Sequence, residues 1–201
     1  VVSMVERVAV RYWNDRANES LAARLFDRAD ALYNRVLSFD PGNAEALAGQ
    51  GAVLASQGRI EEAIPLFERA VAAEPDSPSA VSRLAQAYDD AGRVEGAASM
   101  YERLGGLEGV SPTDVQRGLG FLSNRGRYRQ ALGLAKLYAE EHPDDSTALA
   151  VLGQCCMAHG RIEEAIEVWE KAARLRPGDT RLRQALFDAY GRLGRTPPSD
   201  L

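Results

Sequence analysis

The chain has 201 residues, 45% of them hydrophobic and 26% charged, with a formal net charge of −5 at pH 7. This composition is typical of a globular protein that can bury a core, and its acidic balance argues against a nucleic-acid partner, because such proteins usually present a basic face to phosphates. No apolar run approaches the ~18 residues of a membrane helix, so we expect no direct membrane span in this sequence.

Only two cysteines occur, Cys155 and Cys156, and they are adjacent. A neighbouring pair cannot form a disulfide framework and lacks the spacing of a zinc site, so we expect one core thiol beside one half-exposed thiol. Cysteine scarcity leaves the compartment open between the cytoplasm and the periplasm or cell envelope. All but two of the 24 basic residues are arginine, a bias that favours a bacterial source.

The first ten residues lack the layout of a signal peptide. Because the chain begins with valine, we expect a fragment or a processed chain, and whether a leader or anchor lies outside it stays open. Residues 1–9 are predicted to form an amino-terminal helical extension.

Residues 10–43 are predicted to form the first pair of helices, in which Trp13, Ala29 and Tyr33 fit a helical pattern. Arg24 stands where every later pair has a glycine. The sequence therefore leaves open an earlier turn in this pair, near residues 18–20, with a longer second helix.

The next two pairs are predicted over 44–77 and 78–111, where apolar residues recur at steps of three and four. Gly58 turns the chain between two helices, because glycine reaches the left-handed conformation that ends a helix. In the third pair, three glycines within residues 105–109 predict a shortened second helix, since each glycine lowers helix stability by about 1 kcal/mol. We expect residues 104–110 to be a flexible joint between units 1–3 and units 4–6.

Two further pairs are predicted over 112–145 and 146–179. A capping helix over 180–194 and a tail over 195–201 complete the chain. The heptapeptide GRIEEAI begins at Gly58 and again at Gly160, and 160 − 58 = 102, which is 3 × 34. A period of 34 residues therefore relates pairs that lie far apart in the sequence.

The same period governs the local signals of every pair. Gly-Arg dipeptides recur every 34 residues, beginning at Gly58, Gly92, Gly126, Gly160 and Gly194. Residues whose side-chain oxygens satisfy the first N–H groups of a helix recur at the same interval, at Asn43, Ser77, Ser111, Asp145 and Asp179. Each unit thus consists of a cap, a helix, a glycine turn and a second helix, ended in most units by a proline.

At these residues the sequence resembles the tetratricopeptide repeat family, whose units are 34-residue helix–turn–helix hairpins. The resemblance covers residues 10 to about 194. It implies an all-α fold, a right-handed superhelical solenoid of antiparallel helix pairs with about 11 helices. It also implies a concave groove lined by the first helix of each unit.

Such a groove implies a non-catalytic scaffold that binds a partner protein or an extended peptide, with no cofactor and no metal. Side-chain amides suit this task because they both donate to and accept from a peptide backbone. The candidate groove residues are Asn14, Asn18, Ser82, Arg83, Gln86, Gln116, Arg117 and Gln154. Some family members hold a C-terminal carboxylate in a basic clamp, but here only Asn18 and Arg83 match it and both lysines are missing.

Catalysis has little support in the sequence. His142 and His159 fall at expected helix ends, where a cation complements the helix dipole, and no phosphate loop, metal cluster or nucleophile elbow occurs.

Two alternatives to a peptide-binding scaffold stay open. One is self-assembly into a homo-oligomer, favoured by apolar residues near the amino end: Val1, Val2, Met4, Val5 and Val8. The other is that the repeats are the targeting arm of a larger enzyme whose catalytic domain lies outside this sequence.

Overall fold

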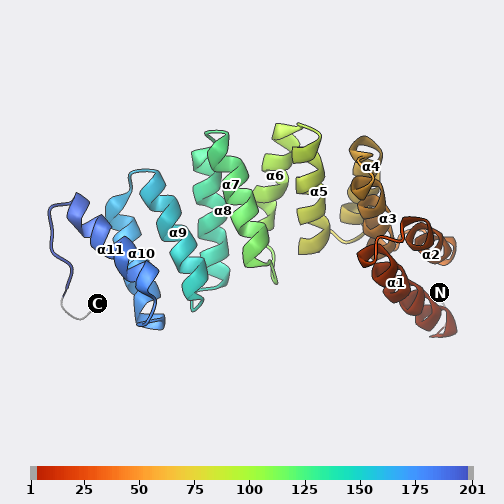
Figure 1. Ribbon diagram of the computed structural model, residues 1–201, viewed down its shortest axis with the longest axis horizontal. Coiled ribbons are helices and arrows are strands. Elements are labelled where there is room, and N and C mark those ends of the chain that lie inside the picture. The colour runs from red at the N-terminus through yellow and green to blue at the C-terminus, as the bar shows by residue number, and fades with distance from the viewer. Residues whose placement is uncertain (1–3, 199–201) are drawn as a thin grey trace. The chain divides into compact units, whose positions relative to one another are not determined.

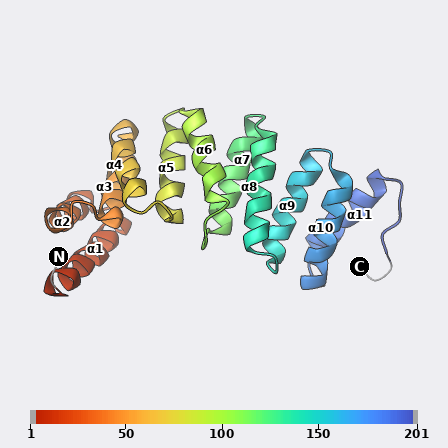
Figure 2. The same cartoon turned by 180° about the vertical axis from the view of Figure 1, so that it is seen from behind.

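The structure, a computed structural model, describes residues 4–198 and the side chains of residues 7–198. These residues form eleven helices and no strand, which confirms the all-α prediction (Figures 1 and 2). The helices are α1 (Met4–Ala22), α2 (Phe26–Phe39), α3 (Ala44–Ser56), α4 (Ile60–Ala73), α5 (Pro78–Asp90), α6 (Val94–Leu104), α7 (Pro112–Asn124), α8 (Tyr128–Glu141), α9 (Ser146–Ala158), α10 (Ile162–Leu175) and α11 (Thr180–Arg192).

The chain divides into two compact units, residues 1–100 and 101–201. In the first unit α1 packs on α2, α2 on α3, α3 on α4 and α4 on α5, and α3 also touches α1 and α5. In the second unit α7 to α11 pack in the same consecutive order, and α7 also touches α9. Within each unit these helices that follow each other in sequence are therefore neighbours in space, which is the packing of a helical repeat solenoid.

The Gly-Arg dipeptides end the first helix of a pair in one common way. At Gly58 φ is +79°, and the N–H of Arg59 donates to the carbonyl of Leu54 at 3.0 Å. A left-handed residue together with this bond satisfies carbonyls at the end of a helix. The other four dipeptides repeat the arrangement, with a positive φ at Gly92, Gly126, Gly160 and Gly194.

The first pair makes the same turn without a glycine. Because α1 continues through residues 18–20, the expectation of an earlier turn and a longer second helix is wrong. Arg24 adopts φ +58°, and the N–H of Leu25 donates to the carbonyl of Ser20 at 2.8 Å. Ser20 is itself buried, so α1 still packs on the core at the residues where the earlier turn was expected. Packing thus holds an arginine in the conformation that glycine adopts elsewhere.

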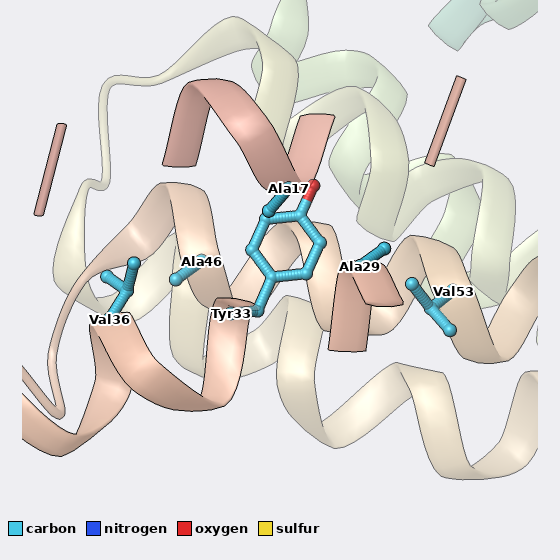
Figure 3. Packing of buried hydrophobic residues seen from close by; sticks show 6 residues of the cluster. All are labelled: Ala17, Ala29, Tyr33, Val36, Ala46 and Val53. Carbon is cyan, nitrogen blue, oxygen red and sulfur yellow. The ribbon is translucent and has the colours of Figure 1, made fainter. Parts of the chain in front are cut away.

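Glycines of the first helices lie directly against aromatic rings of the second helices. A methyl group at Gly153 would lie 2.3 Å from Nε1 of Trp169, and one at Gly49 would lie 2.2 Å from Cζ of Tyr33. Each ring therefore packs on a helix backbone at a distance that only glycine permits. In the core of the first unit, small residues surround the ring of Tyr33, as Figure 3 shows for Ala17, Ala29 and Ala46.

The second helix of the third pair is shorter than its equivalents. α6 has 11 residues, whereas α2, α4, α8 and α10 have 14, which confirms the expected shortening. A methyl group at Gly105 would lie 2.9 Å from Cδ1 of Leu134 and 3.1 Å from its carbonyl oxygen. Gly105 therefore has a packing role against α8, and Gly109, with φ +72°, has a turn role. The flexible joint at residues 104–110 stays a prediction.

Replacing Arg24 with glycine should stabilise the protein by roughly 1 kcal/mol, because a residue with a Cβ is strained in the left-handed region. For a chain of this length the gain corresponds to a rise in Tm of about 2–4 °C, which thermal denaturation measures. Arg24→Ala removes the same charge but keeps the strain, so it is the matched control. An unchanged or lower Tm for Arg24→Gly contradicts this account of the turn.

Gly153→Ala should destabilise the protein by about 1–3 kcal/mol, because the new methyl group overlaps the ring of Trp169. Gly120 in α7 is the matched control, since a methyl group there meets no atom within 4 Å. Gly120→Ala should stabilise the helix by up to about 1 kcal/mol. Urea denaturation measures both changes, and equal effects of the two substitutions would exclude ring contact as the reason for Gly153.

Candidate functional site

A pocket of about 630 Å³ opens in the first unit, and we call it the first-unit pocket. Most of its lining comes from the first helices of three successive pairs, α1, α3 and α5. The lining residues are Asn18, Leu21 and Ala22 of α1, Tyr33 of α2, Ala44, Glu45, Ala48 and Gly49 of α3, Glu74 and Ser77 between α4 and α5, and Ser79, Ala80 and Arg83 of α5.

Small residues of α3 keep the first-unit pocket open. Ala44, Ala48 and Gly49 contribute little volume to its lining. Gly49 also allows the ring of Tyr33 to pack against α3, because any Cβ at this position would overlap the ring. As a result α2 contributes a phenol to a pocket that is otherwise built largely from first helices.

Hydrogen bonds connect Tyr33 through α1 to α3. The hydroxyl of Tyr33 donates to Oδ1 of Asn18 at 2.6 Å, and Nδ2 of Asn18 donates to Oε1 of Glu45 at 2.8 Å. Oε2 of Glu45 accepts from Nδ2 of Asn14 at 3.0 Å. One carboxylate therefore holds two amides of α1 against the first turn of α3, where the helix dipole also favours a negative charge.

The phenol of Tyr33 is a neutral donor at physiological pH. Burial raises the pKa of Tyr33 to about 12, the charge of Arg83 opposes this rise, and the charge of Glu45 adds to it. The hydroxyl consequently keeps its proton and its hydrogen bond to Asn18. Ionisation of this phenol therefore does not disturb the polar side of the first-unit pocket at physiological pH.

Arg83 connects the first-unit pocket to a smaller one. The smaller pocket, of about 150 Å³, is lined by Ala52, Ala55, Ser56, Phe67, Arg83, Gln86, Ala87 and Asp90. Among the described residues, Arg83 makes no hydrogen bond or ion pair. Its guanidinium therefore keeps its donors for a ligand.

The remaining candidate groove residues differ in exposure. Asn14 and Ser82 are only 3% and 4% exposed, so neighbouring helices cover them. Asn14 borders a separate pocket of about 510 Å³ on α1. Gln86 is exposed beside Arg83 in the smaller pocket. The structure thus brings Asn18 and Arg83 together in one pocket and places Gln86 next to it.

Three candidates lie in the second unit. Gln116 and Arg117 are exposed on α7, and Gln154 is exposed on α9. The guanidinium of Arg117 donates to the carboxylate of Asp114 at 3.0 Å, one turn away on the same helix. Their place in a binding groove stays a prediction.

Sequence reasoning missed the two carboxylates of the first-unit pocket, Glu45 and Glu74. An acid in the first turn of a helix has a sufficient structural reason in the helix dipole, which is why Glu45 drew no notice. The repeat register does carry a signal, because the positions equivalent to Glu45 hold no second acid: Arg11, Ser79, Thr113, Thr147 and Arg181. Glu45 therefore differs in chemical type from the residues at the equivalent positions of the other units, and this difference distinguishes its unit from them.

The cysteines are structural. Both are buried, at 7% and 1% exposed, so the expectation that one thiol is half-exposed is wrong. Burial, together with the neighbouring Cys156, raises the pKa of Cys155 to about 11. Cys155 therefore stays a thiol and is a poor nucleophile. His142 and His159 follow the last residues of α8 and α9, at helix ends as expected.

The described residues contain no cluster of three or more His, Cys, Asp or Glu side chains arranged to hold a metal ion. Within residues 4–198, no helix combines the length and the apolar character that crossing a membrane requires.

Comparison with protein families explains the period. A tetratricopeptide repeat model matches residues 54–116 and 124–186, and a second tetratricopeptide model matches residues 14–78. The chain belongs to the tetratricopeptide repeat family. Tetratricopeptide solenoids are scaffolds for protein–protein interaction, and the consecutive helix pairs of this chain have that architecture.

Solved tetratricopeptide structures share the fold. The crystal structure of MamA gives a TM-score of 0.58 at 20% identity, over 86% of this chain and 94% of that one. The structure of YrrB, described as a tetratricopeptide protein with an unusual peptide-binding site, gives a TM-score of 0.54 at 22% identity, over 86% and 89% of the two chains. At these identities the likeness concerns the fold alone.

One curated relative is similar over a short stretch. The Phagocyte signaling-impaired protein of Drosophila pseudoobscura pseudoobscura is 31% identical over 68 residues, which is 34% of this chain and 7% of that protein. The chain thus spans a small part of the curated relative it matches.

The raised pKa of Tyr33 predicts a loss of stability at alkaline pH. The folded-state pKa lies above the ordinary value of 10.0, so the contribution of Tyr33 is fully present below pH 10 and is lost as the pH rises towards about 12. Tyr33→Phe should have a lower free energy of unfolding at neutral pH, since it loses the bond to Asn18, but a smaller further loss between pH 10 and 12. Denaturant titrations at a series of pH values measure this, and identical pH profiles for the two proteins would contradict it.

Proposed function

We propose that this chain is a non-catalytic scaffold that binds an extended segment of a partner protein in the first-unit pocket. The observation that carries the proposal is the combination of an open pocket of about 630 Å³ with a polar side and with small residues that leave it empty. Arg83 and the free lone pairs of Glu45 offer groups for hydrogen bonds with a ligand, while Ala44 and Ala48 offer apolar contact. Peptide sites combine these two kinds of group, with main-chain bonds for affinity and pockets for side chains.

The family supports the same assignment. Tetratricopeptide repeats bind proteins, and YrrB, which has the same fold, is described as having a peptide-binding site. In this chain Asn18, Arg83 and Gln86 lie in or beside the first-unit pocket. Gln116, Arg117 and Gln154 would extend recognition to the second unit.

Selection of peptides from a phage-displayed random library tests the proposal. We expect enriched peptides with micromolar affinity, about −8 kcal/mol. Ser79 is exposed on the wall of the first-unit pocket, so Ser79→Trp should fill the pocket and weaken binding at least tenfold. Ser38→Trp places the same side chain at an exposed position of α2 that does not line the pocket and should leave binding unchanged. Failure to enrich any peptide, or equal affinities for the two variants, argues against the proposal.

A second candidate function is self-association through α1. Val8 and Tyr12 are 65% and 57% exposed and are spaced by one helical turn, so they form an apolar surface on this helix. The expected contributions of Val1 and Val2 lie outside the described residues, as do those of the side chains of Met4 and Val5.

Light scattering at increasing concentration tests self-association. If α1 forms the interface, the molar mass rises with concentration, and Tyr12→Ser returns the protein to a monomer. Tyr128→Ser, which removes a tyrosine of similar exposure from α8, is the control. A monomer at every concentration rules out this candidate. The role of a targeting arm for an enzyme outside this sequence stays a prediction, as does the compartment.

A further inference from the structure

The first-unit pocket has an excess of negative charge. Two carboxylates, Glu45 and Glu74, and one guanidinium, Arg83, are its ionised side chains. Among the described residues, neither carboxylate has a basic side chain within ion-pair distance of 4.0 Å. Neither carboxylate therefore has a direct ion-pair partner within the described part of the chain, although Arg7 and Arg11 line a neighbouring pocket together with Glu45.

The hydrogen-bonding capacity of the pocket points in the same direction. Asn18 already donates to Glu45 and accepts from Tyr33, so much of its amide is used inside the protein. A carboxylate offers about four lone-pair sites, and Glu45 accepts two N–H bonds, which leaves about half of its capacity. Glu74 has no side-chain hydrogen bond among the described residues. Glu45 and Glu74 thus present free acceptors, which a ligand group must meet with donors, while the N–H groups of Arg83 stay available for acceptors of the ligand.

We infer that the first-unit pocket receives a lysine or arginine side chain of the bound segment, with its charged head group at Glu45 and Glu74. This inference rests on the proposed function and adds the chemical class of the ligand. The aliphatic stem of a long basic side chain would lie on Ala44 and Ala48, because such stems pack along apolar surface while the charged end meets polar groups.

Arg83 determines on which side of the pocket the basic head group lies. Its positive charge repels the basic head group from the α5 side of the pocket and so favours the side that holds the carboxylates. The guanidinium is then available for a main-chain carbonyl of the same segment, since it carries five N–H donors and no acceptor. A free C-terminal carboxylate, by contrast, would meet the like charges of Glu45 and Glu74.

Blocked nonapeptides provide the test. A positional library with acetylated and amidated ends carries lysine, arginine, norleucine or glutamate at one fixed position. We expect lysine and arginine to bind about three- to tenfold more tightly than norleucine, and glutamate to bind most weakly. Raising the ionic strength should reduce this preference, because exposed charge pairs are screened by salt.

Three substitutions assign the preference to the pocket. Glu74→Gln removes a charge without breaking a described side-chain hydrogen bond, and Glu45→Gln removes the other charge; each should weaken lysine peptides more than norleucine peptides. Glu163→Gln is the matched control, because Glu163 is also the second residue of its helix and is exposed. Arg83→Gln should keep or increase the preference for lysine. Circular dichroism and Tm values confirm that each variant is folded.

The outcomes separate this inference from the proposed function. A preference for glutamate overturns the inference but leaves peptide binding intact. Unblocked versions of the same peptides that bind only with a free C-terminus, and lose binding in Arg83→Gln, overturn it in the same way. A lysine preference that persists in both Glu45→Gln and Glu74→Gln also overturns it. If no peptide binds at all, the inference and the proposed function fail together.

Discussion

The contact between the ring of Tyr33 and the backbone of α3 at Gly49 determines how the first-unit pocket is built. Because Gly49 has no Cβ, α2 approaches α3 closely and places the phenol at the edge of the pocket. From there the hydroxyl orients Asn18, and Asn18 in turn meets Glu45. Tyr33 also belongs to the core of the first unit, so the same side chain stabilises this unit and shapes its pocket. A change that loosens the ring would disturb both the stability and the polar side of the pocket.

The repeat divides the sequence into positions that build the scaffold and positions that give each unit its character. Turn glycines, caps and small core residues recur every 34 residues, because every helix pair packs on its neighbours in the same way. Glu45 lies in the same register as Ser79 and Thr113, yet among these equivalent positions it alone holds a carboxylate. Under the proposed function, such departures give this unit its ligand preference.

The sequence predicted the fold well because its signals are local. The glycine turn at Gly58 and the short α6 follow from conformational preferences of a few neighbouring residues. The turn at Arg24 was missed, because burial of the α1 face overrides a preference for glycine that is worth only about 1–2 kcal/mol. The sequence also could not predict hydrogen bonds between side chains that lie far apart in the chain. The period places Asn14 on a face of α1, but it does not show that Glu45, 31 residues later, covers and binds its amide.

The central claim is that one pocket in the first unit recognises an extended segment of a partner. Nuclear magnetic resonance mapping tests it most directly, by following backbone amide shifts as a selected peptide is added to the isotope-labelled protein. The account predicts that the largest changes cluster at residues lining the pocket on α1, α3 and α5, including Asn18, Glu45 and Ser79. Large changes confined to the second unit, or to the outer face of α2, would contradict it.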